Sequence, residues 1–258
     1  MGTTKPTKIN QLLQSQPTGT VFLSSWLTTK GYSHELLKKY RKSEWLTSIG
    51  SGAMVRTGED TGYAGAIYSL QKQAGLQIHL GARTALSLQG RAHYLYFHLK
   101  NIFLFSQNGT QLPSWFLNHD WGHKIHHKST SFLPSGIGLT SFKHNTFSIK
   151  ISGPERAIME CLHLTPKTFS FIECYELMEG LSTLRPNQVQ QLLEKCKSVR
   201  VKRMFLYLAE KVDHQWFHYI KTDKIDLGSG KRALVKGGVF VPEYNITVPK
   251  ELENQSLI

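Results

Sequence analysis

The stretch SSWLTTKGYSHELLKKYRKSEWLTSIGSGAMVR, residues 24–56, decides the fold of the first part of the chain. Ser24 favours the N-cap of a helix and Gly31 favours its end, so a short helix is expected between them. After a three-residue turn, Ser33 caps a second helix that we expect to run to about Ser43. Two short helices joined by a tight turn are typical of a helix-turn-helix.

The residues on either side complete a known order of elements. Residues 45–49 and 53–56 flank the tripeptide Gly50-Ser51-Gly52, which predicts a hairpin. Upstream, residues 8–16 carry apolar side chains at helical spacing, and residues 21–23 form a short extended run. This is the order of a winged helix-turn-helix. One small core is expected to hold Ile9, Leu12, Trp26, Leu36, Tyr40 and Trp45.

Beyond this unit the sequence predicts a larger mixed α/β domain, so that the whole chain is α+β, with a mainly antiparallel sheet and a late helical cluster. Helices are expected over residues 64–73, 81–89, 154–164, 169–181, 187–197 and 201–212. Strands are expected over residues 94–97, 102–105, 115–117, 124–127 and 146–151, with a strand-like tail from Trp216. We place the winged helix and its connecting helices in residues 1–94 and the second domain in residues 95–258, with a boundary between residues 57 and 94.

Charge points to the class of partner. The chain has 31 Lys and Arg against 18 Asp and Glu, a net charge of +13. Residues 1–58 carry eight basic and two acidic side chains, and residues 61–150 carry eight basic and one acidic side chain. Residues 151–258 carry fifteen basic and thirteen acidic side chains, so the excess of positive charge lies in the first 150 residues. Such an excess favours a partner that bears phosphates, the alternative being charge that only keeps the protein soluble.

The helix over residues 33–43 has an apolar side and a basic side. Leu36, Leu37 and Tyr40 share one side, and His34 and several cations lie on the other. Such a helix can sit on its own core and face the major groove of double-stranded DNA, although a basic helix face can also be merely solvated. The candidate DNA-binding residues are Lys5, Lys8, Ser33, His34, Lys38, Lys39, Arg41, Lys42, Ser51 and Arg56.

Other features exclude several classes of protein. The longest apolar run, Ile102–Phe105, is far shorter than the roughly 20 residues of a membrane span, and the polar start does not resemble a signal peptide. Cys161, Cys174 and Cys196 are odd in number and lack metal spacing, so we expect buried structural thiols. These features predict a soluble, cytoplasmic protein without a membrane partner.

No catalytic or metal-binding constellation is evident. The stretch His119–His127 is rich in histidine, but its pattern suggests strand and turn, so a closed zinc site is not expected. Residues 228–232 lack the glycine and hydroxyl of a phosphate-binding loop. The acids Glu155, Glu160, Glu173, Glu176 and Glu179 lie at helical spacing and are interpreted as solvated. We therefore expect no cofactor, no metal and no catalytic residue.

Six stretches of sequence follow one another in an order that resembles the AbiEi family. The first likeness is residues 21–58, similar to the winged-helix module of that family. The later blocks are LGARTALSLQG (80–90), ISGPERAIME (151–160), SVRVKRMFLYLAE (198–210), LGSGKR (227–232) and ITVP (246–249). Together they span residues 8 to 249.

The resemblance implies a transcriptional autoregulator and antitoxin of a type IV toxin–antitoxin system. Its winged helix would bind inverted repeats in its own promoter, and its second domain would counter a nucleotidyltransferase toxin of the AbiEii kind, generally without a stable complex. The cations near these blocks are candidates for antitoxin function, or else cap helices and pair with Glu155 and Glu160. They are Arg83, Arg156, Arg200, Lys202, Arg203, Lys231 and Arg232.

An enzyme acting on nucleic acid, such as a nuclease or nucleotidyltransferase with a winged-helix targeting module, is the alternative. That chemistry requires two or three carboxylates to hold Mg²⁺. Residues 61–150 offer only Asp120, and Asp213, Asp223 and Asp226 are scattered. The scarcity of acids favours a regulator that is not an enzyme.

Overall fold

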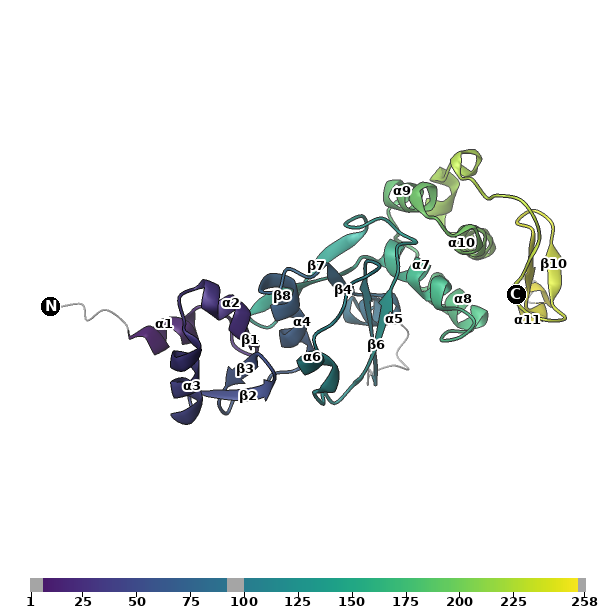
Figure 1. Ribbon diagram of the computed structural model, residues 1–258. Coiled ribbons are helices and arrows are strands. Elements are labelled where there is room, and N and C mark those ends of the chain that lie inside the picture. Colours follow the sequence, from purple (N-terminus) through teal and green to yellow (C-terminus); the bar gives the residue numbers. More distant parts are fainter. Residues whose placement is uncertain (1–6, 92–99, 255–258) are drawn as a thin grey trace.

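Three separate sheets follow one another along the chain in the computed structural model, which describes residues 7–91 and 100–254. Figure 1 shows the winged unit at one end, a five-stranded sheet with its helices in the middle, and a helical cluster with a small sheet at the other end. The α+β class, with a winged helix-turn-helix before a larger mixed domain, is confirmed.

The N-terminal unit has the predicted order of elements. They are α1 (Lys8–Gln14), β1 (Phe22–Leu23), α2 (Ser24–Thr29), α3 (His34–Lys42), β2 (Leu46–Gly50) and β3 (Ala53–Arg56). Its sheet has the order β1-β3-β2. As expected, Ser33 caps α3, since its hydroxyl accepts a hydrogen bond from the Leu36 amide at 3.2 Å.

A separate apolar cluster stabilises this unit. Its fully buried members are Leu12, Phe22, Leu27, Tyr32, Leu37, Leu46 and Met54. The prediction that Trp45 belongs to this core is wrong, because Trp45 is 48% exposed. The chain turns at Glu44, which has a φ of 58°, and the next strand points Leu46 inward, so its neighbour lies on the opposite face.

The winged unit is joined to the rest of the molecule through α4 (Tyr63–Lys72). The Ser69 hydroxyl donates to the Val21 carbonyl and accepts from the Val21 amide, at 2.6 and 3.0 Å. Gln73, just after α4, accepts from the Leu23 amide at 2.8 Å. At Gly65 the helix lies so close to the Gly19 carbonyl that any side chain would collide with it. The backbone groups of Val21 and Leu23, at the free edge of the sheet, are therefore hydrogen-bonded by the side chains of Ser69 and Gln73.

The middle sheet has the order β6-β5-β4-β8-β7. Its strands are β4 (Ile78–Leu80), β5 (Asn101–Ser106), β6 (Lys124–Ser129), β7 (Leu139–His144) and β8 (Phe147–Ser152). The β4–β8 and β5–β6 pairs are parallel and the other two are antiparallel, so the sheet is mixed and not mainly antiparallel as expected. A cut between residues 94 and 95 would separate the central strand β4 from both of its neighbours.

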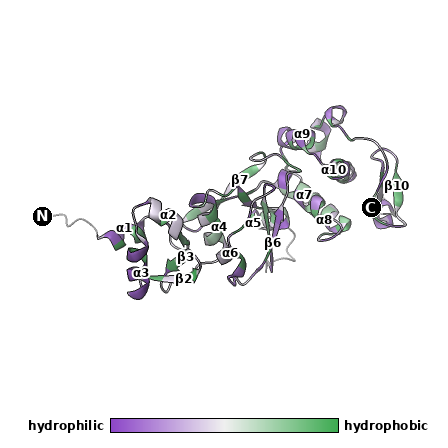
Figure 2. Cartoon of the chain, in the orientation of Figure 1, coloured by the Kyte–Doolittle hydropathy of each residue, from purple (hydrophilic) through white to green (hydrophobic). Residues whose placement is uncertain are grey.

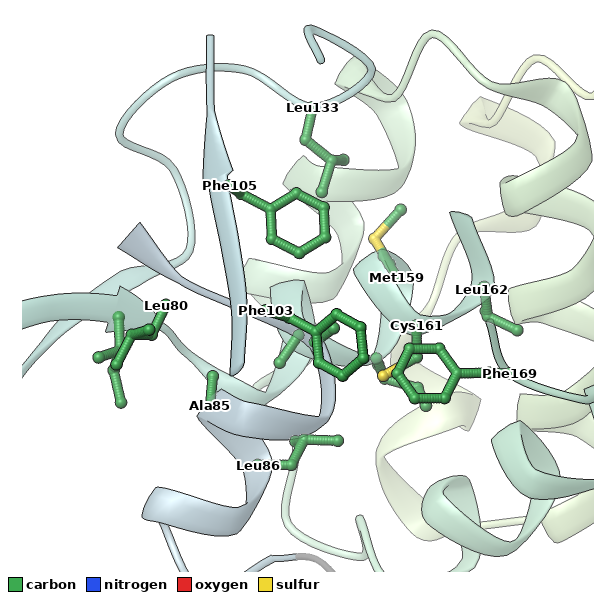
Figure 3. Close-up of a cluster of buried hydrophobic side chains, with 14 of the residues drawn as sticks. Leu80, Ala85, Leu86, Phe103, Phe105, Leu133, Met159, Cys161, Leu162 and Phe169 are labelled. Carbon is green, nitrogen blue, oxygen red and sulfur yellow. The ribbon is translucent and has the colours of Figure 1, made fainter. Parts of the chain in front are cut away.

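Helices α5 (Ala82–Leu88) and α7 (Pro154–Leu164) pack beside this sheet and enclose the main core. Figure 3 shows Phe103 and Phe105 of β5 reaching toward Met159 and Cys161 of α7. The Phe103 ring also contacts Phe169, with ring centroids 5.0 Å apart. All three cysteines are buried, as predicted, and burial raises the pKa of the Cys196 thiol to about 11.

The C-terminal part consists of a helical cluster and a small sheet. Its elements are α8 (Phe171–Glu179), α9 (Pro186–Lys195), α10 (Val199–Val212), the 3₁₀ turns η2 (Gln215–Tyr219) and η3 (Thr222–Lys224), β9 (Arg232–Ala233), β10 (Val239–Val241), β11 (Ile246–Val248) and α11 (Lys250–Asn254). The sheet order is β10-β11-β9. The tail is therefore less uniformly extended than expected, because 3₁₀ turns precede its strands.

Two further expectations about the middle domain need correction. The predicted strand over residues 115–117 is a short helix, α6 (Ser114–Asn118), which starts after Pro113 and buries two adjacent aromatic side chains. The strand β7 was not expected; it forms a hairpin with β8 through Asn145, which has a φ of 49°. The predicted strand over residues 94–97 lies outside the described residues.

Candidate nucleic-acid interface

The exposed face of α3 carries the densest set of the predicted DNA-binding residues. Leu37 is buried beneath the helix, while His34, Lys38, Lys39, Arg41 and Lys42 are all exposed. Among the described residues, no ion pair joins the three lysines to an acidic side chain. Figure 2 shows α3 largely in the purple of hydrophilic residues, at the far end of the molecule. This face can offer unpaired cations to an anionic surface.

The remaining candidates near α3 have different surroundings. Ser33 is occupied as the helix cap, and Ser51 is exposed at the tip of the β2–β3 hairpin. The Lys8 ammonium group donates to the Gly31 carbonyl at 3.0 Å and lies over the Tyr32 ring, so it joins α1 to the turn before α3. Lys5 lies outside the described residues.

Arg56, also selected as a candidate on the wing, is half-buried and bonded within the protein. Its guanidinium donates to the carbonyls of Leu13, Gln16 and Pro17 at 2.6, 2.6 and 3.0 Å. It also pairs with Glu59 at 3.0 Å. These carbonyls lie in the last turn of α1 and just after it, where carbonyl groups lack helical N–H donors, and Arg56 supplies the donors. The structure thus makes Arg56 a link between the wing and α1.

The hairpin is held against the middle domain and does not project freely. Gly50, which ends β2, lies against Trp115 of α6, where an added Cβ would be 2.7 Å from the Trp115 Cβ. Its φ of 152° is also a conformation that favours glycine. The tip with Ser51 therefore has a fixed position relative to the five-stranded sheet.

One candidate cation, Arg156, pairs with a buried carboxylate of α7. Glu160 of α7 accepts hydrogen bonds from His79 Nε2 at 2.9 Å, Arg156 Nε at 2.8 Å, the Ser152 hydroxyl at 2.7 Å and the Ala82 amide at 3.0 Å. Burial alone would raise the pKa of Glu160, but His79, Arg156 and the hydrogen bonds outweigh it and lower the pKa to about 2. The carboxylate is thus fully buried and charged.

The prediction that Glu155 and Glu160 are solvated is wrong, because helical spacing alone does not show which faces other elements cover. Both side chains are buried, at 1% and 0% exposure. Glu155 pairs with Arg185 at 2.9 Å, and that hydrogen bond overcomes burial to lower the pKa of Glu155. Arg185 was not among the candidates, since it follows no recognisable motif. The expectation that Arg156 could pair with Glu160 is confirmed.

Two cations of α10 hold the C-terminal sheet in place. Arg203, only 1% exposed, donates to the carbonyls of Leu227, Gly228, Gly230 and Asn245 at 2.6 to 3.2 Å. Lys202 donates to the Asp226 carbonyl at 2.6 Å. A buried guanidinium needs such acceptors for all of its donors. Both residues therefore have a structural role in this fold.

The last four candidate cations are more accessible. Arg83 pairs with Glu173 at 2.5 Å. Lys231 lies over the Phe240 ring at 4.7 Å, and Arg232 is exposed on β9. Arg200 is half-buried, and its Nη2 donates to the carbonyls of His163 and Thr165 at 3.2 and 2.9 Å. The candidates therefore do not converge on one site.

Two family models cover nearly the whole chain. One, described as the N-terminal domain of the transcriptional regulator AbiEi antitoxin, matches residues 5–97. The other, described as transcriptional regulator, AbiEi antitoxin, type IV toxin–antitoxin system, matches residues 99–249. The chain belongs to the AbiEi family. It is thus a transcriptional regulator and antitoxin of a type IV toxin–antitoxin system.

A solved structure has a similar fold. The crystal structure of the RV2827C protein from Mycobacterium tuberculosis has a TM-score of 0.59 to this chain at 12% identity. The match covers 93% of this AbiEi chain and 89% of that chain. At this identity the likeness shows the fold alone. No curated protein matches the chain.

The blocks that resemble AbiEi proteins mostly build the interior. In the block over residues 80–90, Gly81 lies so close to Glu160 and Phe105 that only glycine fits. The Thr84 hydroxyl of the same block accepts a hydrogen bond from the Phe103 amide at 2.9 Å. The block over residues 151–160 supplies the buried carboxylates. Within the described residues, no three His, Cys, Asp or Glu side chains are grouped to hold a metal ion. No helix in that same part of the chain has the length and apolarity to span a membrane.

Proposed function

We propose that α3 is the recognition helix through which this regulator binds its own promoter. Lys38, Lys39 and Lys42 would contact phosphates, while His34 and Arg41 would face base edges. Ser51 at the hairpin tip, Lys8 and Lys5 would contact the flanking backbone. The observation that carries this proposal is the unpaired cationic face of α3 on a complete winged helix.

Repression would follow from occupancy of the promoter. Because each chain presents one recognition helix, two chains on inverted repeats would give the two half-sites that such proteins bind. Arg56 is left out of the proposed contacts, since its guanidinium is used within the protein. The regulator would act in the cytoplasm, where its promoter lies, and without catalysis.

The experiment is a mobility-shift titration with promoter DNA over a range of salt concentrations. We expect Lys38→Ala with Lys42→Ala to weaken binding and to reduce the slope of log affinity against log salt by about 2, because each phosphate contact contributes about 0.9. Lys143→Ala with Lys150→Ala removes the same charge from the β7–β8 hairpin and is the matched control. Unchanged affinity and slope in the α3 variant would refute the assignment.

We also propose that the partner toxin is a nucleotidyltransferase of the AbiEii kind and that the C-terminal half opposes it without forming a stable complex. The balanced charge after residue 150 and the separation of this half from α3 support that division. Of the candidate cations there, Lys231 and Arg232 remain exposed and are the ones we propose for this role.

The division of labour can be tested in the intact protein. The α3 variant is expressed from an independent promoter together with the induced toxin, and cell growth and repression are measured side by side. We expect repression to fall while protection against the toxin remains. Loss of protection at equal protein level would show that neutralisation depends on DNA binding.

A further inference from the structure

A basic cavity lies in the middle domain, far from α3. It is bordered by β5, by the edge strand β6, by the segment that follows α7 and by Arg200 of α10. Its volume is about 540 Å³, which is within the range of about 300–1,000 Å³ typical of small-molecule sites. Figure 1 shows α3 at one end of the elongated molecule, whereas β6 lies in the middle and α10 toward the other end.

The lining has a single sign of charge. Lys128, Lys167 and Arg200 provide cations, and no Asp or Glu among the described residues borders the cavity. Within the described residues, none of these three side chains has an acidic partner within ion-pair distance. Fixed cations that converge without carboxylates attract a ligand of high negative charge.

Arg200 is the most constrained of the three cations. Only its Nη2 is used within the described residues, on the carbonyls of His163 and Thr165, so Nε and Nη1 remain for a ligand. Burial lowers the pKa of Arg200 but leaves the guanidinium charged at neutral pH. A planar guanidinium with two unused donor atoms suits the oxygens of a phosphate group.

Three imidazoles complete the lining. His126 Nε2 lies 2.8 Å from Asn101 Oδ1 and His127 Nε2 lies 2.8 Å from the Ser106 hydroxyl, so both rings are held in place. His163 stacks on a phenylalanine ring at 4.1 Å. Burial, Lys128 and Arg200 lower the pKa of His163 to about 4, and it is therefore neutral at physiological pH. The His163 ring has no hydrogen bond within the described residues, so its single N–H can donate to a phosphate oxygen without adding charge.

We propose that this cavity binds the phosphate groups of a free nucleotide. Lys128 and Lys167 approach from the two rims, and Arg200 contacts the phosphate oxygens from the inner wall. The volume of about 540 Å³ is sufficient for a small phosphate ligand. The inference is independent of the role of α3 and assigns a ligand to the part of the molecule beyond the winged unit.

The test is calorimetric titration of the full-length protein with ATP and, separately, with sodium tripolyphosphate. We expect saturable binding with about one site per chain, and a roughly ten-fold loss of affinity in Lys128→Gln with Lys167→Gln, since exposed charge pairs contribute modestly and additively. Lys143→Gln with Lys150→Gln, an equal loss of charge on the β7–β8 hairpin, should change affinity less than about two-fold.

Both lysine pairs are exposed, so these variants should fold, which melting curves would verify. The proposal would be overturned if neither ATP nor tripolyphosphate bound saturably. It would also be overturned if the wild type and the Lys128/Lys167 variant bound these probes with equal affinity. A parallel titration with promoter DNA distinguishes the remaining source of phosphate. If the Lys128/Lys167 variant lost DNA affinity but kept its affinity for ATP, the cavity would belong to the DNA surface and the proposal would be wrong.

Discussion

Replacing Glu160 by Gln should strongly destabilise the middle domain. The carboxylate is fully buried and accepts from four donors on β4, the first residue of α5, β8 and α7 itself. An amide nitrogen at the Oε1 position would face the donors of His79 and Arg156, and at the Oε2 position it would face the Ala82 N–H. In both orientations a donor faces a donor, and the Arg156 charge loses its anion. Breaking a buried ion pair in this way costs about 3–5 kcal/mol.

The pH dependence gives an independent magnitude. The pKa of Glu160 is lowered from 4.5 to about 2, and a difference of this size corresponds to about 3 kcal/mol of folding free energy. Because the folded state binds this proton less tightly than the unfolded chain does, the contribution is complete above about pH 5. It is lost as pH falls from 4.5 toward 2.

The assay is urea unfolding of wild type and Glu160→Gln at several pH values between 7 and 3. We expect the variant to lose about 3–5 kcal/mol at pH 7 and the difference to narrow as pH falls. Glu176→Gln on the exposed face of α8 is the control and should change stability by less than about 0.5 kcal/mol. A loss below about 1 kcal/mol at pH 7, or a difference that is the same at pH 3, would refute the reasoning.

Three further outcomes follow from the packing. Gly65→Ala should destabilise the protein by about 1–3 kcal/mol in thermal melts, because its Cβ would collide with the Gly19 carbonyl. The control Gly62→Ala has open space around its Cβ and should cost less than about 1 kcal/mol. Equal costs of the two substitutions would contradict the close approach of α4 to Gly19. Arg56→Ala should lower the free energy of unfolding by about 2–3 kcal/mol, because it leaves carbonyls at and just after the end of α1 without a donor. An unchanged melting temperature would disprove the structural role of Arg56. The three buried cysteines should react with a thiol reagent at pH 8 only after unfolding in urea; rapid labelling of the native protein would show that these thiols are accessible.

Local signals in the sequence account for most of the helices and for the winged unit. A capping serine, a stopping glycine and helical spacing are properties of residues three or four positions apart, so Ser33 is sufficient to predict the start of α3. Pro154 likewise marks the first residue of α7, as observed. The same reasoning failed at Trp115, because a short run of large apolar residues fits a buried strand or a buried helix equally well.

The candidate site was predictable only in part. The exposure of the α3 lysines can be predicted from the amphipathic pattern of that one helix. Its apolar side packs on the core, and the opposite side with the lysines is therefore exposed to solvent. Arg56 could not be recognised as a structural residue, because its acceptors near Leu13 and Pro17 lie about forty positions earlier in the chain. The cavity at Arg200 likewise joins β6, α7 and α10, whose proximity no local pattern shows.

The sequence by itself therefore determined the order of elements, the basic face of α3 and the membership of the AbiEi family. Only the tertiary structure decided which charges are buried, which strand lies at the centre of the sheet and which cations remain unpaired. Glu160 illustrates the physical reason, because its hydrogen-bonding partner His79 lies 81 positions away in the sequence. The free energy of a buried charge depends on the partners that folding brings to it, and spacing within one helix contains no information about them.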